Sequence, residues 1–201
     1  MSALPIALNG ERLRAVVVGG GTVGTRKALA LLESGAHVRV VSPEISEQLA
    51  NAVAGDRLEI RRQPYAADAL GDSTIVIAAT GSREINAGIA ADARARGKLV
   101  NVVNAPEESD FHNMAVHRSG DMTIAVSTGG VPGAALRIRD ALAVRFDSRY
   151  ERALSALARL RGRLLAEPGD SWDRAAAELI ADDFCPSVEK ESLPERVAAW
   201  R

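Results

Sequence analysis

Short apolar runs alternate with helical patterns over the first hundred residues of the chain. Runs rich in β-branched residues predict strands at Arg14 to Val18, His37 to Val41, Glu59 to Arg62, Thr74 to Ala78 and Leu99 to Val103. Segments rich in Ala and Leu predict helices at 24–33 and 83–96, and Gly35 stands where a helix C-cap glycine belongs. This alternation predicts an α/β fold built on one Rossmann-type, doubly wound parallel sheet.

The pattern changes in the second half of the chain. A run from Thr123 to Val126 predicts one more strand, and "STGGVPGAALRIRDAL" then predicts a glycine turn and a helix. From Ser148 onward, leucines recur at helical spacing among arginines, which predicts an amphipathic helix. Further helices are expected after a Pro-Gly break and at "SLPERVAAW", where Ser192 and Glu195 have capping-box spacing.

Composition narrows the possible partners and the compartment. The chain has 25 Lys and Arg against 26 Asp and Glu, so no excess charge favours nucleic acid or a membrane as a partner. The single cysteine, Cys185, excludes an internal disulfide and a cysteine-based zinc cluster and suits a reducing compartment. No leader pattern and no apolar run of membrane-spanning length is present. We therefore expect a cytoplasmic protein with an aliphatic core, in which Trp172 and Trp200 are core residues.

The segment "VVVGGGTVGTRKA", residues 16–28, points to a dinucleotide. Gly19, Gly21 and Gly24 have the G-x-G-x-x-G spacing between a strand and a helix. In such a turn the first glycine makes the bend, the second lets backbone approach a pyrophosphate, and the third lets helix and strand pack closely. The alternative is a βα turn that is merely rich in glycine.

The residue that would hold the adenosine ribose is displaced. Rossmann sites usually carry an acid at the end of the second strand. Here that strand ends "VRVVSPE", so the first acid, Glu44, comes two residues after Ser42. No arginine follows the strand directly, which favours NAD over NADP.

Two more loops follow predicted strands, at the sheet edge where ligands bind in such folds. The loop "IAATGSREIN" places Thr80 and Gly81 beside the expected cofactor, and "NVVNAPEESDF" places Asn101, Asn104 and Asp110 near a substrate. Ordinary turn formation is the alternative reading of these residues.

Taken in order, four segments resemble the precorrin-2 dehydrogenase family, the NAD-dependent module of siroheme synthase. They are "LPIALNGERLRAVVVGGGTVGTRKALALLESGAHVRVVSPE", "AAT", "NVVNAP" and "IAVSTGG", and the likeness covers residues 4 to 145. The resemblance implies a Rossmann domain at 1–112, a dimerisation segment at 113–147 and a helical domain at 148–201. It also implies a homodimer that oxidises precorrin-2 to sirohydrochlorin, passing hydride to NAD, in siroheme or cobalamin biosynthesis. Some members of the family also insert ferrous iron.

The resemblance also assigns site residues. It adds Thr22, Val23, Pro43 and Glu44 to the cofactor contacts, beside the glycines, Thr80 and Asn101. The family motif usually has aspartate where this chain has Asn104, and an amide cannot act as a carboxylate base or as an anionic metal ligand. We therefore keep two alternatives to the dehydrogenase: a dinucleotide-binding or sensing module with impaired catalysis, and a Rossmann oxidoreductase with another substrate.

The remaining candidates concern catalysis and the substrate. His112 and His117, with Asp110 nearby, could hold a metal ion, but their spacing matches neither one helix face nor one strand face. We expect no metal, and we assign His112 beside Asn104 as a catalytic candidate. Ser127, Thr128 and Arg137 are assigned to substrate carboxylates, because arginine and helix-terminal N–H groups bind them well. For Arg137, as for Arg139 and Arg145, a solvated helix face is the alternative.

Overall fold

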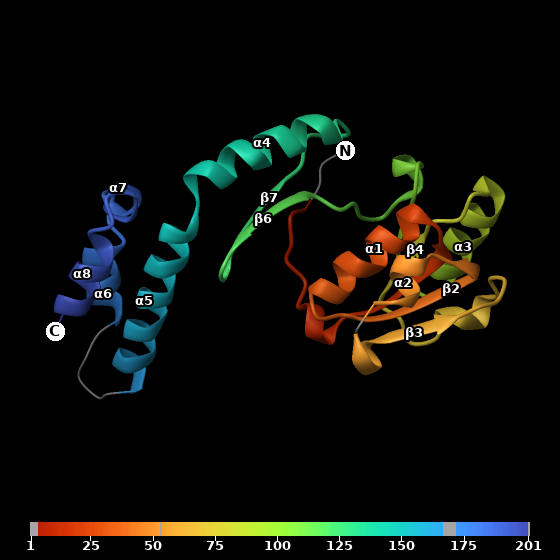
Figure 1. The fold of residues 1–201 in the computed structure, drawn as a ribbon, viewed down its shortest axis with the longest axis horizontal. Helices are drawn as coiled ribbons and strands as arrows, with labels where there is room; N and C mark the ends of the chain where they lie inside the picture. The colour runs from red at the N-terminus through yellow and green to blue at the C-terminus, as the bar shows by residue number, and fades with distance from the viewer. Residues whose placement is uncertain (1–3, 53, 167–171, 201) are drawn as a thin grey trace. The chain divides into compact units, whose positions relative to one another are not determined.

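The computed structural model describes residues 4–52, 54–166 and 172–200. The chain divides into two compact units, Met1–Asn113 and Met114–Arg201, each traced in Figure 1. In the described ranges, no helix is long and apolar enough to cross a membrane.

The first unit is built on a five-stranded, all-parallel sheet. Its strands are β1 (Arg14–Gly20), β2 (His37–Ile45), β3 (Leu58–Arg61), β4 (Ile75–Ala78) and β5 (Leu99–Val102). Their order is β3-β2-β1-β4-β5. The chain winds outward from β1 to β3 and then crosses back to add β4 and β5, so the switch point lies between β1 and β4. This confirms the predicted Rossmann-type sheet.

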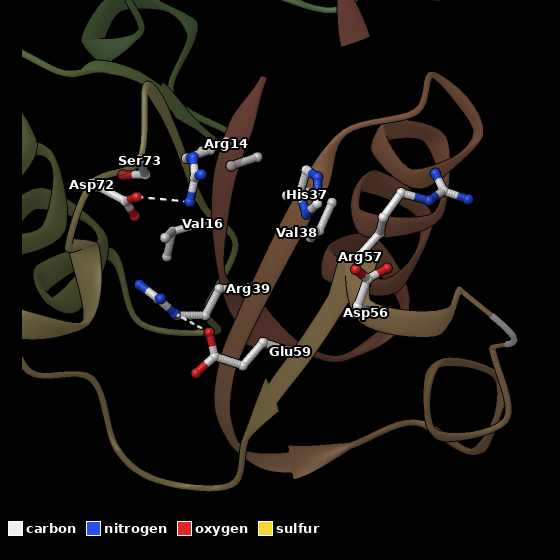
Figure 2. Close-up of a pocket in the computed structure, with 11 residues that line it drawn as sticks. Arg14, Val16, His37, Val38, Arg39, Asp56, Arg57, Glu59, Asp72 and Ser73 are labelled. Carbon is white, nitrogen blue, oxygen red and sulfur yellow. Dashed lines mark hydrogen bonds and ion pairs between the residues drawn. The ribbon is translucent and has the colours of Figure 1, made fainter. Parts of the chain in front are cut away.

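The amino-terminal edge of this sheet carries charges that neutralise one another (Figure 2). A pocket of about 170 Å³ lies there, among residues at the starts of β1, β2 and β3 and in the segments before β3 and β4. Arg14 pairs with Asp72 at 2.8 Å, and Arg39 pairs with Glu59 at 2.6 Å. Ligands of open α/β sheets bind at the opposite, carboxyl edge. A ligand of this sheet is therefore expected at the carboxyl edge.

Helices cover both faces of the sheet. They are α1 (Thr22–Glu33), α2 (Glu47–Ala50) and α3 (Arg83–Ala95), with short 3-10 turns at Gly10–Arg12, Gly55–Arg57, Ala67–Leu70 and Pro106–Glu108. Helix α1 ends at Glu33, and Gly35 follows with a φ of 91°, as its predicted C-cap role requires.

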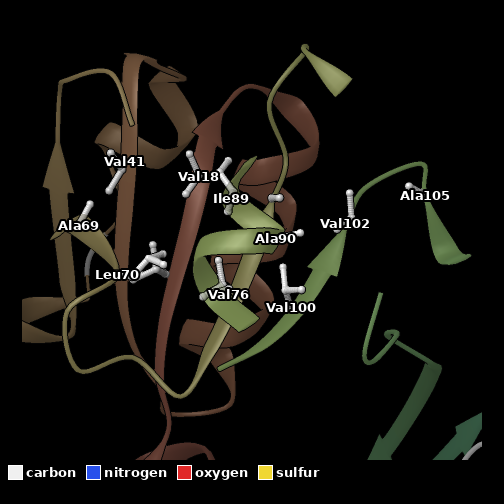
Figure 3. Packing of buried hydrophobic residues seen from close by; sticks show 13 residues of the cluster. Val18, Val41, Ala69, Leu70, Val76, Ile89, Ala90, Val100, Val102 and Ala105 are labelled. Atoms are coloured by element: carbon white, nitrogen blue, oxygen red, sulfur yellow. The ribbon is translucent and has the colours of Figure 1, made fainter. Parts of the chain in front are cut away.

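The core consists of two aliphatic layers, because successive strand residues face opposite sides. On one face, Val16 and Val18 pack with Ile89 and Ala93 of α3; Figure 3 shows Ile89 lying beside Val18. On the other face, Val17 packs with residues of α1 and α2. Strand β1 is therefore buried on both sides, which holds the glycine turn at its end in a fixed position.

The second unit begins with a hairpin that the sequence analysis did not predict. Strand β6 (Ala115–Ser119) pairs antiparallel with β7 (Met122–Val126) in a separate two-stranded sheet. Only the β7 region was expected as a strand. The polar residues His117 and Arg118 interrupt the run of apolar residues that would have predicted β6. The strand is recognised only from its pairing with β7.

The helices that the structure describes after the hairpin are α4 (Pro132–Arg145), α5 (Ser148–Ala166), α6 (Trp172–Leu179), α7 (Phe184–Glu189) and α8 (Leu193–Ala199). Leu157, Leu160 and Leu164 of α5 are buried in one cluster with residues of α6, α7 and α8, which confirms the predicted amphipathic helix. Trp200 is buried in this core and Trp172 packs against it, as expected.

The predicted capping box at Ser192 is wrong. Ser192 stands at the N-cap of α8 but has helical φ and ψ angles of −84° and −18°, and its side chain makes no capping hydrogen bond. Its hydroxyl instead donates to the carbonyl oxygen of Ser187 at 3.3 Å. The short connection between α7 and α8 turns this hydroxyl back toward α7.

Candidate functional site

The glycine turn after β1 leaves no room for side chains at Gly19, Gly20 and Gly24. A Cβ atom on Gly19, where φ is 116°, would stand 2.3 Å from the carbonyl oxygen of Ala79. One on Gly20 would stand 2.2 Å from the carbonyl oxygen of Glu44, and one on Gly24 would stand 1.9 Å from that of Gly19. These glycines therefore allow β1, β2, β4 and α1 to meet at one point.

Gly21 differs from these three glycines. A Cβ atom there would meet nothing within 4 Å, and the φ of −75° suits any residue. Gly21 is exposed at the N-cap of α1, which has no side-chain cap. The N–H groups of the first helical turn lack intrahelical partners and carry partial positive charge. Open space before such a helix end fits the diphosphate of a dinucleotide.

Two hydroxyl groups that the sequence analysis did not identify stabilise this turn through hydrogen bonds. The Oγ1 atom of Thr25 donates to the carbonyl oxygen of Gly20 at 3.2 Å and lies 2.7 Å from the Oγ atom of Ser46. Ser46 also caps α2, accepting from the Leu49 N–H at 3.2 Å. One sign of this contact was present in the sequence: Thr25 is a polar residue on the apolar, buried face of α1.

The register between β1 and β2 explains the displaced acid. Val18 pairs with Val41, but Gly20 pairs with Ile45, so two steps along β1 match four steps along β2. The extra length of β2 includes Pro43 and Glu44, both of which are exposed beside the glycine turn. The strand therefore continues past Ser42, and the acid lies at its carboxyl end after all.

The loop after β4 is held by Asn86 of α3. The Oδ1 atom of Asn86 accepts from the Thr80 N–H at 3.0 Å and from the Thr80 hydroxyl at 2.7 Å. Its Nδ2 atom donates to the carbonyl oxygen of Thr80 at 3.2 Å. The polar groups of Thr80 are thus engaged within the protein, while the neighbouring Gly81 is exposed.

The loop after β5 separates three residues that the sequence analysis grouped. Buried Asn101 donates to the carbonyl oxygen of Phe111 at 2.9 Å. Asp110 accepts from the Val100 N–H at 2.9 Å and pairs with Arg94 at 3.2 Å. Both side chains therefore hold the returning loop against β5. Asn104 is exposed, with a φ of 64°, a left-handed conformation that asparagine tolerates better than most residues.

The two candidate histidines, His112 and His117, lie in different units. His112 is exposed at the end of the first unit, and the next residue, Asn113, accepts from the Lys27 ammonium at 2.7 Å. Desolvation by burial, with help from neighbouring Arg26, lowers the pKa of Lys27. His117 lies on β6, where its Nε2 atom is 2.7 Å from the carbonyl oxygen of Phe146. In the described part of the chain, no three His, Cys, Asp or Glu residues gather to hold a metal ion.

The predicted substrate contacts all belong to the second unit. Ser127 is exposed before a turn in which Gly129 and Gly130 have φ values of 60° and 105°, and the Thr128 hydroxyl donates to the carbonyl oxygen of Val131 at 2.6 Å. On α4, Arg139 pairs with Asp140 and Arg145 pairs with Glu189. Arg137 is exposed and has no ion-pair partner among the residues described.

Several known proteins are similar to this chain. It is 41% identical to the siroheme synthase of Chromobacterium violaceum over 140 residues, which are 69% of this chain and 30% of that protein. It is 36% identical to the siroheme synthase of Pseudomonas fluorescens over 177 residues, or 88% and 38% of the two chains. A third siroheme synthase, from Nitrosococcus oceani, is 33% identical over 199 residues, or 96% and 42%. The chain thus spans less than half the length of these relatives.

A solved structure has the same fold along nearly the whole chain. "SirC, precorrin-2 dehydrogenase" superimposes with a TM-score of 0.76 and 24% identity, covering 98% of this chain and 100% of that one. A family described as putative NAD(P)-binding matches residues 6–115, which include the whole parallel sheet and the glycine turn. The chain therefore belongs to this putative NAD(P)-binding family.

Proposed function

We propose that this chain is a precorrin-2 dehydrogenase that acts in the cytoplasm. Precorrin-2 loses a hydride to NAD and a proton to a base or to solvent, which gives sirohydrochlorin and NADH. The main observation in favour of NAD binding is the open space at Gly21, before the uncapped end of α1. The substrate half is supported by the siroheme synthases at 33% to 41% identity and by the segments "NVVNAP" and "IAVSTGG".

The residues at the carboxyl edge of the sheet fit NAD. Gly21 leaves space for the diphosphate, and the first-turn N–H groups of α1, including those of Thr22 and Val23, are available as its donors. The Glu44 carboxylate, exposed beside the turn, accepts hydrogen bonds from the adenosine ribose hydroxyls. When bound, NAD supplies the hydride acceptor.

Asn104 has a positioning role in this proposal. Its amide both donates and accepts hydrogen bonds but has no proton that titrates near neutral pH. It therefore orients the macrocycle rather than removing a proton. The other proposed contacts complete the site: His112 is the second catalytic candidate, and Arg137, Ser127 and Thr128 bind the carboxylates of the substrate.

We further propose that residues 113–147 join two copies of the chain. Helix α4 and the residue before it expose four large apolar side chains: Val131, Leu136, Ile138 and Val144. The hairpin of β6 and β7 forms a sheet of only two strands, and such sheets are marginally stable alone. A second copy would cover these apolar side chains and extend the sheet.

Turnover tests the proposal directly. The protein is incubated with anaerobically prepared precorrin-2 and NAD, with and without ferrous iron, while NADH and the sirohydrochlorin spectrum are followed. We expect both to appear, and appearance of siroheme in the iron-containing sample would add chelation. NAD binding without turnover would instead favour a dinucleotide-binding module, the alternative that Asn104 keeps open.

A further inference from the structure

A groove lies between α5 and α8 in the helical part of the second unit, and the proposed function does not use it. It has a volume of about 370 Å³, near the lower limit for small-molecule sites. The two helices pack against each other along it, as can be followed in Figure 1. The groove is lined by Ala156, Leu160, Pro194, Val197 and Ala198, and by Arg159 and Arg163. It is thus apolar except for two cations.

Arg159 differs from the other arginines of α5. Arg149 pairs with Asp147, Arg152 pairs with Glu191, and the Arg161 guanidinium lies over the Trp172 ring. Among the residues described, Arg163 makes a single long contact, 3.5 Å, with the carbonyl oxygen of Trp200. Arg159 has no hydrogen-bond, ion-pair or ring partner in the described ranges.

The two groove arginines can act together. They stand four positions apart on one helix, where side chains are neighbours with Cβ atoms about 5–6 Å apart. No acidic residue lines the groove in the part of the chain that the structure describes. The guanidinium donors therefore remain available to an external anion, and guanidinium binds carboxylates in a two-pronged geometry.

We propose that this groove binds the edge of an apolar ring that carries two neighbouring carboxylates. A pyrrole ring with an acetate and a propionate on adjacent carbons has this chemistry: the ring would lie on the apolar side chains, and the carboxylates would reach Arg159 and Arg163. The choice of a tetrapyrrole as ligand rests on the proposed function, whereas the groove and its unpartnered cation do not. The groove has room for only an edge of the macrocycle, and all the residues that line it belong to the second unit.

Direct binding tests this inference without any turnover. Uroporphyrin is a stable tetrapyrrole whose pyrrole rings each carry an acetate and a propionate. The full chain is titrated with uroporphyrin in the absence of NAD, by calorimetry and by quenching of tryptophan fluorescence, since Trp200 follows α8, one of the two helices that form the groove. We expect Arg159→Gln to weaken one binding event by about tenfold or more, because one charge-assisted carboxylate contact is lost.

Two further variants make the test specific. Arg161→Gln, which removes a cation from the same helix outside the groove, should leave the affinity unchanged. Ala198→Trp fills the groove from an exposed position and should weaken the same binding event. Thermal melting of each variant shows that it folds.

The outcomes separate the two proposals. Absence of uroporphyrin binding, or wild-type affinity in both Arg159→Gln and Ala198→Trp, overturns the groove site whatever the dehydrogenase assay gives. Groove binding that these variants weaken, together with no turnover of precorrin-2, would remove the proposed dehydrogenase and leave the groove site standing.

Discussion

The carbonyl oxygen of Gly19 lies 1.9 Å from the point where a Cβ atom of Gly24 would stand, so α1 rests directly on the backbone of the turn that precedes it. The fold therefore requires a glycine at position 24. It does not require one at position 21, where a Cβ atom would meet nothing within 4 Å. Two glycines of one motif can therefore be separated by experiment, since one serves packing and the other leaves space for a ligand.

Gly21→Val should weaken NAD binding by tenfold or more, because the new side chain enters the proposed space of the diphosphate. Its free energy of unfolding should change by about 1 kcal/mol or less, the scale of an N-cap substitution. Gly24→Val should instead destabilise the fold by about 3 kcal/mol through overpacking. Calorimetric titration and urea unfolding measure the two effects. Wild-type NAD affinity in a folded Gly21→Val protein would contradict the cofactor placement.

Asn104→Asp should give a faster dehydrogenase. Aspartate tolerates the left-handed backbone at this position, where φ is 64°, and a positioned general base typically contributes about 10²-fold or more. The turnover number with saturating precorrin-2 and NAD is the measurement. Asn104→Gly, which keeps the backbone conformation and removes the amide, is the matched control. An unchanged or lower rate in Asn104→Asp would rule out a missing carboxylate as a limit on the reaction.

Glu44→Arg should shift cofactor preference from NAD toward NADP. The carboxylate favours ribose hydroxyls and repels a 2′-phosphate, whereas a guanidinium binds that phosphate. The ratio of the two dissociation constants should change by about tenfold or more. Glu33→Gln, at the far end of α1, should leave the ratio as it is. If Glu44→Arg also leaves it unchanged, the ribose contact assigned to Glu44 is wrong.

Val144→Glu should convert the proposed dimer into a monomer. Val144 is 78% exposed in the single chain, so the substitution costs little there but would place a charge in an apolar interface. Light scattering after size exclusion reports the mass. Leu165→Glu on α5, at a position that is 62% exposed, lies outside residues 113–147 and should not change it. A wild-type chain that is monomeric at all concentrations would refute the proposal.

Glu59→Gln should reduce the loss of stability in acid. Burial tends to raise the pKa of Glu59, but hydrogen bonds from Arg39 and Arg61, both at 2.6 Å, outweigh it and lower the pKa below its ordinary 4.5. A carboxyl with a lowered folded-state pKa stabilises the fold fully above its ordinary pKa, and this contribution is lost as the pH falls through the folded value. Urea unfolding across this range should show a shallower acid limb for Glu59→Gln than for wild type. Glu47→Gln, at an exposed glutamate on α2, is the control.

Local pattern in the sequence was enough to predict the parallel sheet and the glycine turn. A buried strand, a glycine bend and a helix each leave their pattern within a few consecutive residues, so the elements from Arg14 to Glu33 could be derived without tertiary contacts. The sequence also showed that Glu44 is the first acid after the second strand. It did not show that Glu44 lies beside the glycine turn, because the extra length of β2 becomes evident only when β2 is paired with β1.

The tertiary structure decided which polar side chains are already engaged. Thr80 and Asn101 have the polar groups expected of ligand contacts, yet the Asn86 side chain and the Phe111 carbonyl oxygen, which the fold brings beside them, hold them. The pairing of β6 with β7, and the absence of a partner for Arg159 among the residues described, likewise depend on neighbours that no local pattern specifies. Sequence periodicity determines which face of an element is apolar, but hydrogen-bond partners are set by how separate elements come together in three dimensions.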